Sequence, residues 1–145
     1  MAEARDTATR YLEAFNAHDE SAMRALNAPN IKFEAPGGVR IEGREAATGY
    51  SMVWLKGFPD ARMTADNELI SGPWVVQECT FEGTHAGSFE GPAGTVPPTG
   101  RKVIGHCVQI GRFENGMASE VRLYYDQVEL LTQLGLMPEP AATTA

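Results

Sequence analysis

The sequence RFENGMASEVRLYYD, residues 112–126, contains the clearest structural signal in the chain. Its Asn115-Gly116 dipeptide stands between two runs rich in β-branched and aromatic residues. Such a dipeptide is the strongest short-range indication of a two-residue type I′ hairpin turn. The pattern predicts two antiparallel strands, over residues 102–113 and 117–125, joined by this turn.

Counting outward from the turn, with Glu114 opposite Met117, sorts the side chains onto two faces because alternate residues of a strand share a face. The first face is predicted to carry the aliphatic row Val108, Ile110, Val121 and Leu123. The second face pairs Gln109 with Arg122, Cys107 with Tyr124 and Gly105 with Asp126, so that Glu120, Arg122, Tyr124 and Asp126 form one row. This row has two interpretations: a solvated sheet face with a Glu120–Arg122 ion pair, or a pocket floor bearing an acid, a base and a hydroxyl.

The remaining elements follow from apolar periodicity and from turn residues. Helices are predicted over residues 6–15, from a cap at Asp19 to a stop at Pro29, over 44–58, and from Gln127 to a stop at Gly135. Strands are predicted over residues 31–35, 39–42, 61–70 and 74–84. These elements indicate one α+β domain over residues 1–137, in which helices and a curved antiparallel sheet enclose a pocket, followed by a disordered tail at 138–145.

The segment GSFEGPAGTVPPTG, residues 87–100, is predicted to be a long loop near a sheet end. Its prolines lack backbone donors and its glycines favour turns, so it should continue neither a ladder nor a helix. Because of its length and its place beside His85, we expect it to gate the pocket.

Composition and charge narrow the class of partner. A formal net charge of −7 with a pI near 4.9 makes binding to nucleic acid or to an anionic membrane surface improbable. No apolar run is long enough to span a membrane, and the N-terminal residues do not form a signal peptide, which predicts a cytoplasmic protein. Cys79 and Cys107 lie in apolar strand-like runs, where a thiol acts as a small hydrophobe. A small hydrophobic or neutral molecule is the expected partner.

Several motifs together resemble one known family. They are YLEAFNAHD (11–19), IEGREA (41–46), EGTHAG (82–87), VPPTGR (96–101), RFENGMASE (112–120) and YYDQVELLTQLG (124–135). In this order they resemble the SnoaL-like polyketide cyclases, also called ester cyclases, of the nuclear-transport-factor-2-like (NTF2-like) superfamily. The resemblance implies a cone-shaped α+β barrel, with a strongly bent antiparallel sheet closed by about three N-terminal helices. It also implies a homodimer formed through the outer face of the sheet.

The same resemblance implies a role for Asp126, which corresponds to the general acid/base carboxylate of the characterised cyclases. Those enzymes close a polyketide ring by intramolecular aldol condensation of an ester, without a metal or another cofactor. The alternatives are another acid–base reaction in the same pocket, such as epoxide hydrolysis or keto-steroid-type isomerisation, and a module that binds a small molecule without converting it.

Other candidate residues each have a structural alternative. His85 could orient a substrate carbonyl or bond to the backbone of the neighbouring loop. Trp54, with Tyr50 and Phe58 on the third helix, could line the pocket or belong to the core. Gln109, Arg122, Tyr124 and Glu120 are candidate substrate-binding residues because they share the predicted face of Asp126.

The sequence offers no metal-ligand spacing among His18, His85 and His106, so no metal site is expected. The directions of Glu78 and Glu82 are left open. The aliphatic row predicts a homodimer interface, in which a charge at Ile110 or Val121 should weaken the dimer.

Overall fold

The computed structural model describes residues 2–91 and 94–137, and the predicted tail at 138–145 lies outside them. Its helices are α1 (Ala2–Asn16), α2 (Glu20–Leu26), α3 (Arg44–Gly57) and α4 (Gln127–Gln133). Its strands are β1 (Asn27–Ala35), β2 (Val39–Glu42), β3 (Arg62–Ser71), β4 (Trp74–Thr84), β5 (Phe89–Gly91), β6 (Gly94–Val96), β7 (Lys102–Glu114) and β8 (Met117–Tyr125). The element types match the predictions except over residues 27–30 and 87–100.

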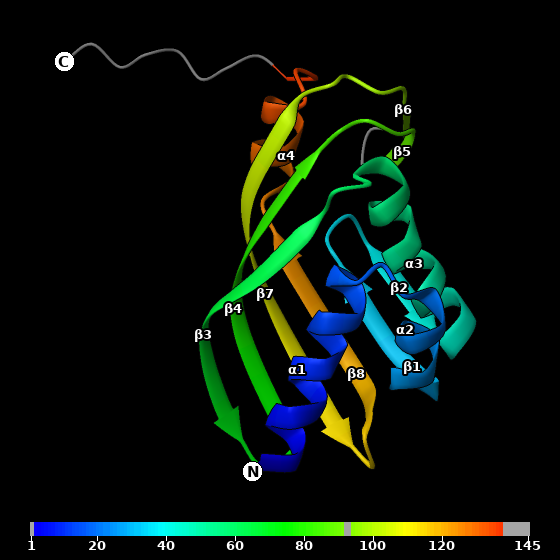
Figure 1. Ribbon diagram of the computed structural model, residues 1–145, viewed down its shortest axis with the longest axis vertical. Helices are drawn as coiled ribbons and strands as arrows, with labels where there is room; N and C mark the ends of the chain where they lie inside the picture. Colours follow the sequence, from blue (N-terminus) through cyan, green and yellow to red (C-terminus); the bar gives the residue numbers. More distant parts are fainter. Residues whose placement is uncertain (1, 92–93, 138–145) are drawn as a thin grey trace, which may run out of the picture.

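Six strands form one sheet in the order β2-β1-β8-β7-β4-β3. Only β1 and β8 run parallel, and the other neighbours pair antiparallel. Figure 1 shows α1 lying along one face of this sheet, with α2 and α3 beside β1 and β2. Helix α4 and the β5–β6 hairpin lie at the end of the molecule opposite the β7–β8 turn (Figure 1). Helices therefore cover one face of the sheet, as the α+β prediction requires.

Two apolar clusters hold the helices on this inner face. One joins α1 to β1, β4, β7 and β8 through residues that include Ala8, Ile31, Phe33, Val75, Phe113 and Val121. The other joins α3 and α4 to β5 and β7 through residues that include Leu55, Phe58, Phe89, Val103, Leu130 and Leu134. Burial of such apolar surface is the main favourable contribution to folding. No helix within the described ranges is both long and apolar enough to cross a membrane.

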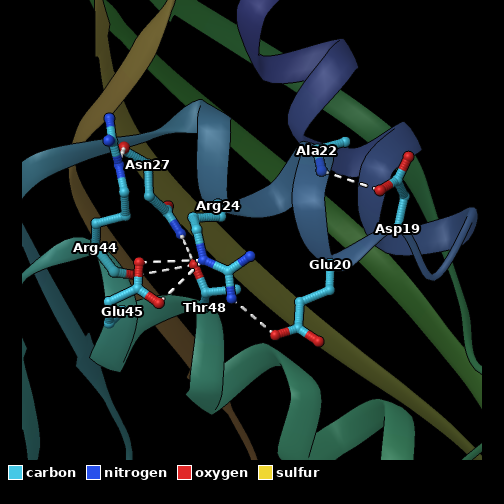
Figure 2. A network of polar contacts seen from close by, with 8 residues as sticks. All are labelled: Asp19, Glu20, Ala22, Arg24, Asn27, Arg44, Glu45 and Thr48. Carbon is cyan, nitrogen blue, oxygen red and sulfur yellow. Dashed lines mark hydrogen bonds and ion pairs between the residues drawn. The ribbon is translucent and has the colours of Figure 1, made fainter.

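A polar network fixes the start of β1 against α3 (Figure 2). The buried Asn27 amide donates to Thr48 Oγ1 at 3.1 Å, and Arg44 Nε donates to the Asn27 carbonyl at 2.7 Å. Figure 2 also shows the predicted cap of α2, in which the Asp19 carboxylate accepts from the Ala22 N–H at 3.0 Å. Strand β1 begins at Asn27 and not at Ile31 as predicted. Pro29 therefore lies within the strand and not in a turn between the second helix and the strand.

The Asn115-Gly116 turn is confirmed, but the register predicted beyond it is wrong by one residue. Both turn residues have positive φ, and Glu114 lies opposite Met117. A β-bulge then follows, because Phe113 pairs with Ala118 whereas Arg112 pairs with Glu120. The extra residue, Ser119, shifts every later pair and so exchanges the two faces of β8 relative to β7.

The exchange of faces changes two predictions. Val121 and Leu123 belong to the inner face, with Val121 fully buried, whereas Val108 and Ile110 belong to the outer face. The predicted aliphatic row of Val108, Ile110, Val121 and Leu123 therefore does not exist as one surface. The predicted row of Glu120, Arg122, Tyr124 and Asp126 is also broken, because its first three members point to the outer face.

Residues 87–100 were predicted to be one long loop, but two short strands lie within them. Strands β5 and β6 form a separate two-stranded antiparallel sheet, with Phe89 opposite Val96. Phe89 is 1% exposed and packs with Trp54 and Phe58. Gly91 and Gly94 pair with each other in this short hairpin, which a buried aromatic residue anchors.

Candidate functional site

A cavity of about 90 Å³ lies between the inner face of the sheet and the four helices. Its wall is mostly apolar and includes Phe15 of α1, Met23 of α2, Trp54 of α3, and Phe33, Phe81 and Leu123 of the sheet. The lining draws on both apolar clusters, with Phe33 from the first and Met23 and Val103 from the second. An enclosed apolar space with few polar groups is the usual form of a site for a small organic ligand.

Asp126 lies at the mouth of this cavity, between the last residue of β8 and the first of α4. Its Oδ1 accepts from the N–H groups of Val128 and Glu129, at 2.9 and 3.1 Å, and so caps α4. The side chain is exposed to solvent. The cap fixes the position of the carboxylate at the edge of an apolar space.

The rest of the mouth is polar, and α4 supplies much of it. Glu129 lies over Gly105, where a Cβ atom would come within 3.4 Å of its Oε1. Gln133 donates through Nε2 to the Ile104 carbonyl at 2.8 Å and accepts the Ile104 N–H through Oε1 at 2.7 Å. These two bonds hold α4 against β7, so the mouth has a defined shape.

Gln109, a predicted substrate-binding residue, lines the cavity from β7 and is buried. Its Nε2 donates to Gln77 Oε1 at 3.4 Å, and Gln77 Nε2 donates to Glu68 Oε2 at 2.9 Å. Because an ionised carboxylate can only accept, Glu68 directs the Gln77 oxygen toward Gln109. One N–H of Gln109 is thereby engaged within the protein.

Trp54 lines the cavity, which is one of the two roles considered for it, together with Tyr50 of the same helix and Tyr125 of β8. The Trp54 and Tyr125 rings meet edge to face with their centroids 5.3 Å apart. Burial raises the pKa of Tyr125 well above its usual range, so its hydroxyl keeps its proton. Sequence reasoning missed Tyr125 because the uncounted bulge placed it on the aliphatic face. The apolar alternation of Val121, Leu123 and Tyr125 was the available signal.

Glu120, Arg122 and Tyr124 do not line the cavity, contrary to the prediction. Glu120 and Arg122 form an ion pair on the outer face, where the Arg122 guanidinium lies 5.5 Å from the Trp74 ring. Tyr124 is 51% exposed. The structural alternative considered for this row, a solvated face with an ion pair, describes these three residues.

His85 is fully buried and does not belong to the cavity lining. Its Nδ1 lies 2.9 Å from Thr99 Oγ1 and accepts the Thr99 N–H at 3.2 Å. Its ring packs on Phe58, with centroids 5.4 Å apart, and burial lowers its pKa. Of the two roles considered for His85, the structure places it in the one that holds the following segment.

The structure also gives the positions of the cysteines and of the two glutamates whose directions were left open. Cys79 and Cys107 face each other across β4 and β7, both buried, and Cys107 lines the cavity. Glu78 and Glu82 are exposed on the outer side of β4. Within residues 2–91 and 94–137, no group of three or more His, Cys, Asp or Glu side chains could hold a metal ion.

Comparison with known proteins gives consistent results. The sequence profile of the family described as SnoaL-like polyketide cyclase matches residues 5–134. No match was found among curated proteins. Among solved structures, IdmH of Streptomyces antibioticus, provisionally described as a polyketide cyclase, is 31% identical, with a TM-score of 0.77 over 91% of this chain and 98% of that one.

Two further structures extend the comparison. AclR of Streptomyces galilaeus, provisionally described as a hydroxylase, is 27% identical, with a TM-score of 0.81 over 97% of this chain and 91% of that one. A protein of Jannaschia sp. CCS1, provisionally described as a SnoaL-like polyketide cyclase, is 24% identical, with a TM-score of 0.83 over 94% of each chain. The last likeness shows the fold alone.

Proposed function

Because the chain belongs to the SnoaL-like polyketide cyclase family, with its NTF2-like fold, we propose that it closes a ring in a small hydrophobic, polyketide-like ester by acid–base catalysis without a cofactor. The observation that carries this proposal is the apolar cavity with a fixed carboxylate, Asp126, at its mouth. Apolar walls suit a hydrophobic carbon skeleton, and the carboxylate can exchange a proton with it.

Asp126 has one oxygen available for this exchange. Oδ1 is engaged by two backbone N–H groups, whereas Oδ2 has no hydrogen-bond partner among the residues that the structure describes. Charge-assisted bonds from backbone donors fix the orientation of a carboxylate. We therefore assign proton transfer to Oδ2.

The reaction follows from the chemistry of carbon acids. The carboxylate removes a proton from a carbon that lies between two carbonyl groups, and the resulting enolate carbon attacks a third carbonyl of the same molecule. A carbon–carbon bond forms, and the former carbonyl oxygen takes up the proton that Asp126 now carries. The product is an isomer of the substrate, so the reaction needs no other reactant.

The proposal is tested by incubating the protein with a linear polyketide methyl ester and separating the products by liquid chromatography with mass detection. We expect a new species that has the substrate's mass or that mass less one water. Binding of the ester without any new species would instead identify a module that holds small molecules. A water added to an epoxide probe would identify the hydrolase alternative.

We also propose that the outer face of the sheet joins two copies of the chain. Val76, Val108 and Ile110 lie together on this face, since Val76 pairs with Ile110 and Val108 is two residues further along β7. Tyr124 extends the surface because it pairs with Val108. An apolar area of this kind on a sheet favours a symmetric dimer.

Ile110→Glu is expected to convert the dimer into a monomer, because it places a charge inside the proposed interface. Sedimentation velocity at micromolar concentration measures the change. Ile70→Glu is the matched control, since Ile70 is also exposed but lies on the edge strand β3. A parent protein that sediments as a monomer would remove the proposal.

Residues 87–100, which we expected to gate the pocket, contain the β5–β6 hairpin. Phe89, Glu90 and Gly91 of this hairpin form one wall of a cleft next to the cavity. The hairpin is held by the buried Phe89 ring and by the Gly87 N–H, which donates to the Gly57 carbonyl at 3.1 Å. Gating by this segment stays a prediction.

A further inference from the structure

The cavity and the cleft share one wall. The cleft measures about 300 Å³ and lies between the turn after β1, helix α3, strand β5 and the start of α4. Tyr50, Trp54 and Tyr125 line both spaces. Among residues 2–91 and 94–137, only these three aromatic side chains are common to the two linings, so they form the boundary between the cavity and the cleft.

The cavity alone is small for the proposed substrate. Sites for small organic ligands commonly enclose about 300–1,000 Å³, whereas the cavity measures about 90 Å³. A substrate larger than this cavity would therefore also occupy the cleft, where it would contact Tyr50, Trp54 and Tyr125.

Two of the other polar hydrogens of the cavity are engaged within the protein. The Tyr11 hydroxyl donates to Asn27 Oδ1 at 2.7 Å, and Gln109 donates one N–H to Gln77. The hydroxyls of Tyr50 and Tyr125 donate to no backbone or carboxylate oxygen within the described residues. Ser51 also lines the cavity, but it does not reach the cleft.

Tyr50 and Tyr125 reach the shared wall from different elements. Tyr50 belongs to α3, whereas Tyr125 is the last residue of β8 and directly precedes Asp126. Tyr50 can therefore contact a bound molecule from another part of the fold than Asp126 does. Burial raises the pKa of both phenols, so both hydroxyls keep their protons and can donate.

We propose that Tyr50, which lines both spaces beside Trp54 and Tyr125, donates a hydrogen bond to the substrate oxygen on which negative charge develops, and that the substrate spans the cavity and the cleft. This inference rests on the proposed function. It makes Tyr50 a catalytic residue in addition to Asp126, and it defines the substrate as elongated, with an enolisable carbonyl near its middle. Donors placed where charge develops stabilise the transition state more than the ground state.

The test measures charge stabilisation without turnover. 2-Naphthol and naphtholate absorb at different wavelengths, so a titration of the bound probe followed by absorption reports the ratio of the two forms. Tyr50→Phe is expected to lower the ratio of bound naphtholate to bound naphthol by roughly 10- to 100-fold relative to the parent, as the loss of a hydrogen bond to a charged group implies. Tyr125→Phe should have a smaller effect in the same direction.

Two controls separate this role from a structural one. Tyr124→Phe makes the same chemical change on the outer face and should leave the ratio unaltered. 2-Methoxynaphthalene cannot ionise, and its affinity should be the same for the parent and Tyr50→Phe if the site keeps its shape. An unchanged ratio in Tyr50→Phe, or no binding of either form to the parent, would overturn the inference.

Measurement of turnover is the second part of the test. If ring closure occurs, Tyr50→Phe should lower kcat by about 10²–10³-fold with little change in KM. If no ring closure is found but the naphtholate ratio depends on Tyr50, the proposed cyclase function fails and the oxyanion site stands. If ring closure occurs and neither kcat nor the ratio depends on Tyr50, the oxyanion site fails and the cyclase function stands.

Discussion

Asp126→Asn is expected to lower the turnover of a polyketide ester by about 10²–10⁴-fold while leaving the fold and the ligand affinity nearly unchanged. The amide keeps the shape of the side chain but cannot take up a proton as a carboxylate does. Asparagine is as good a helix N-cap as aspartate, so Oδ1 can still accept from Val128 and Glu129. Steady-state kinetics and denaturant unfolding measure the two properties separately.

Asp19→Asn provides a matched control, because Asp19 caps α2 in the same manner and does not line the cavity. Its turnover should equal that of the parent protein. Glu129→Gln removes the second carboxylate of the mouth and should have a smaller effect than Asp126→Asn. A turnover within a few-fold of the parent in Asp126→Asn, combined with a large loss in Glu129→Gln, would transfer the catalytic role to Glu129.

Phe89→Ala is expected to lower the free energy of unfolding by about 3–5 kcal/mol, the range for truncating a buried phenylalanine. Phe89 is 1% exposed, and its ring centroid lies 4.8 Å from that of Trp54 and 5.3 Å from that of Phe58. It also fills the space beside Gly57, where a Cβ atom would come within 2.8 Å of the Phe89 ring. The substitution would therefore leave a cavity between α3 and the β5–β6 hairpin.

Urea denaturation followed by circular dichroism measures this change. Glu90→Ala is the control, because the neighbouring side chain is exposed and should alter stability by less than about 0.5 kcal/mol. A Phe89→Ala protein as stable as the control would show that the hairpin is a detachable lid. The sequence-based gating hypothesis would then be preferred over the anchored wall.

Local signals in the sequence were sufficient for most of the fold. Asn115-Gly116 located the central hairpin, Asp19 located a helix cap, and apolar spacing located α1 and α3. These features depend on residues close together in the chain. The resemblance to the cyclases supplied the tertiary arrangement, which periodicity alone does not contain.

The site was predicted less well because the face of a strand depends on every intervening residue. Ser119 looks like any strand residue, yet as the extra residue of a bulge it moved Tyr125 inward and Arg122 outward. The bulge involves backbone geometry at one position, for which the sequence MASEV carries no marker such as glycine. Asp126 kept its place at the cavity because it follows the strand and is positioned by its cap on α4.

The proton transfer assigned to Asp126 can be measured apart from ring closure. A 3-oxo ester too short to close a ring still carries an acidic carbon between two carbonyl groups. Its exchange of hydrogen for deuterium in D₂O is followed by proton NMR, with the buffer rate subtracted. The account predicts that the parent protein accelerates this exchange and that Asp126→Asn does not, whereas equal acceleration by both proteins, or none by the parent, would contradict it.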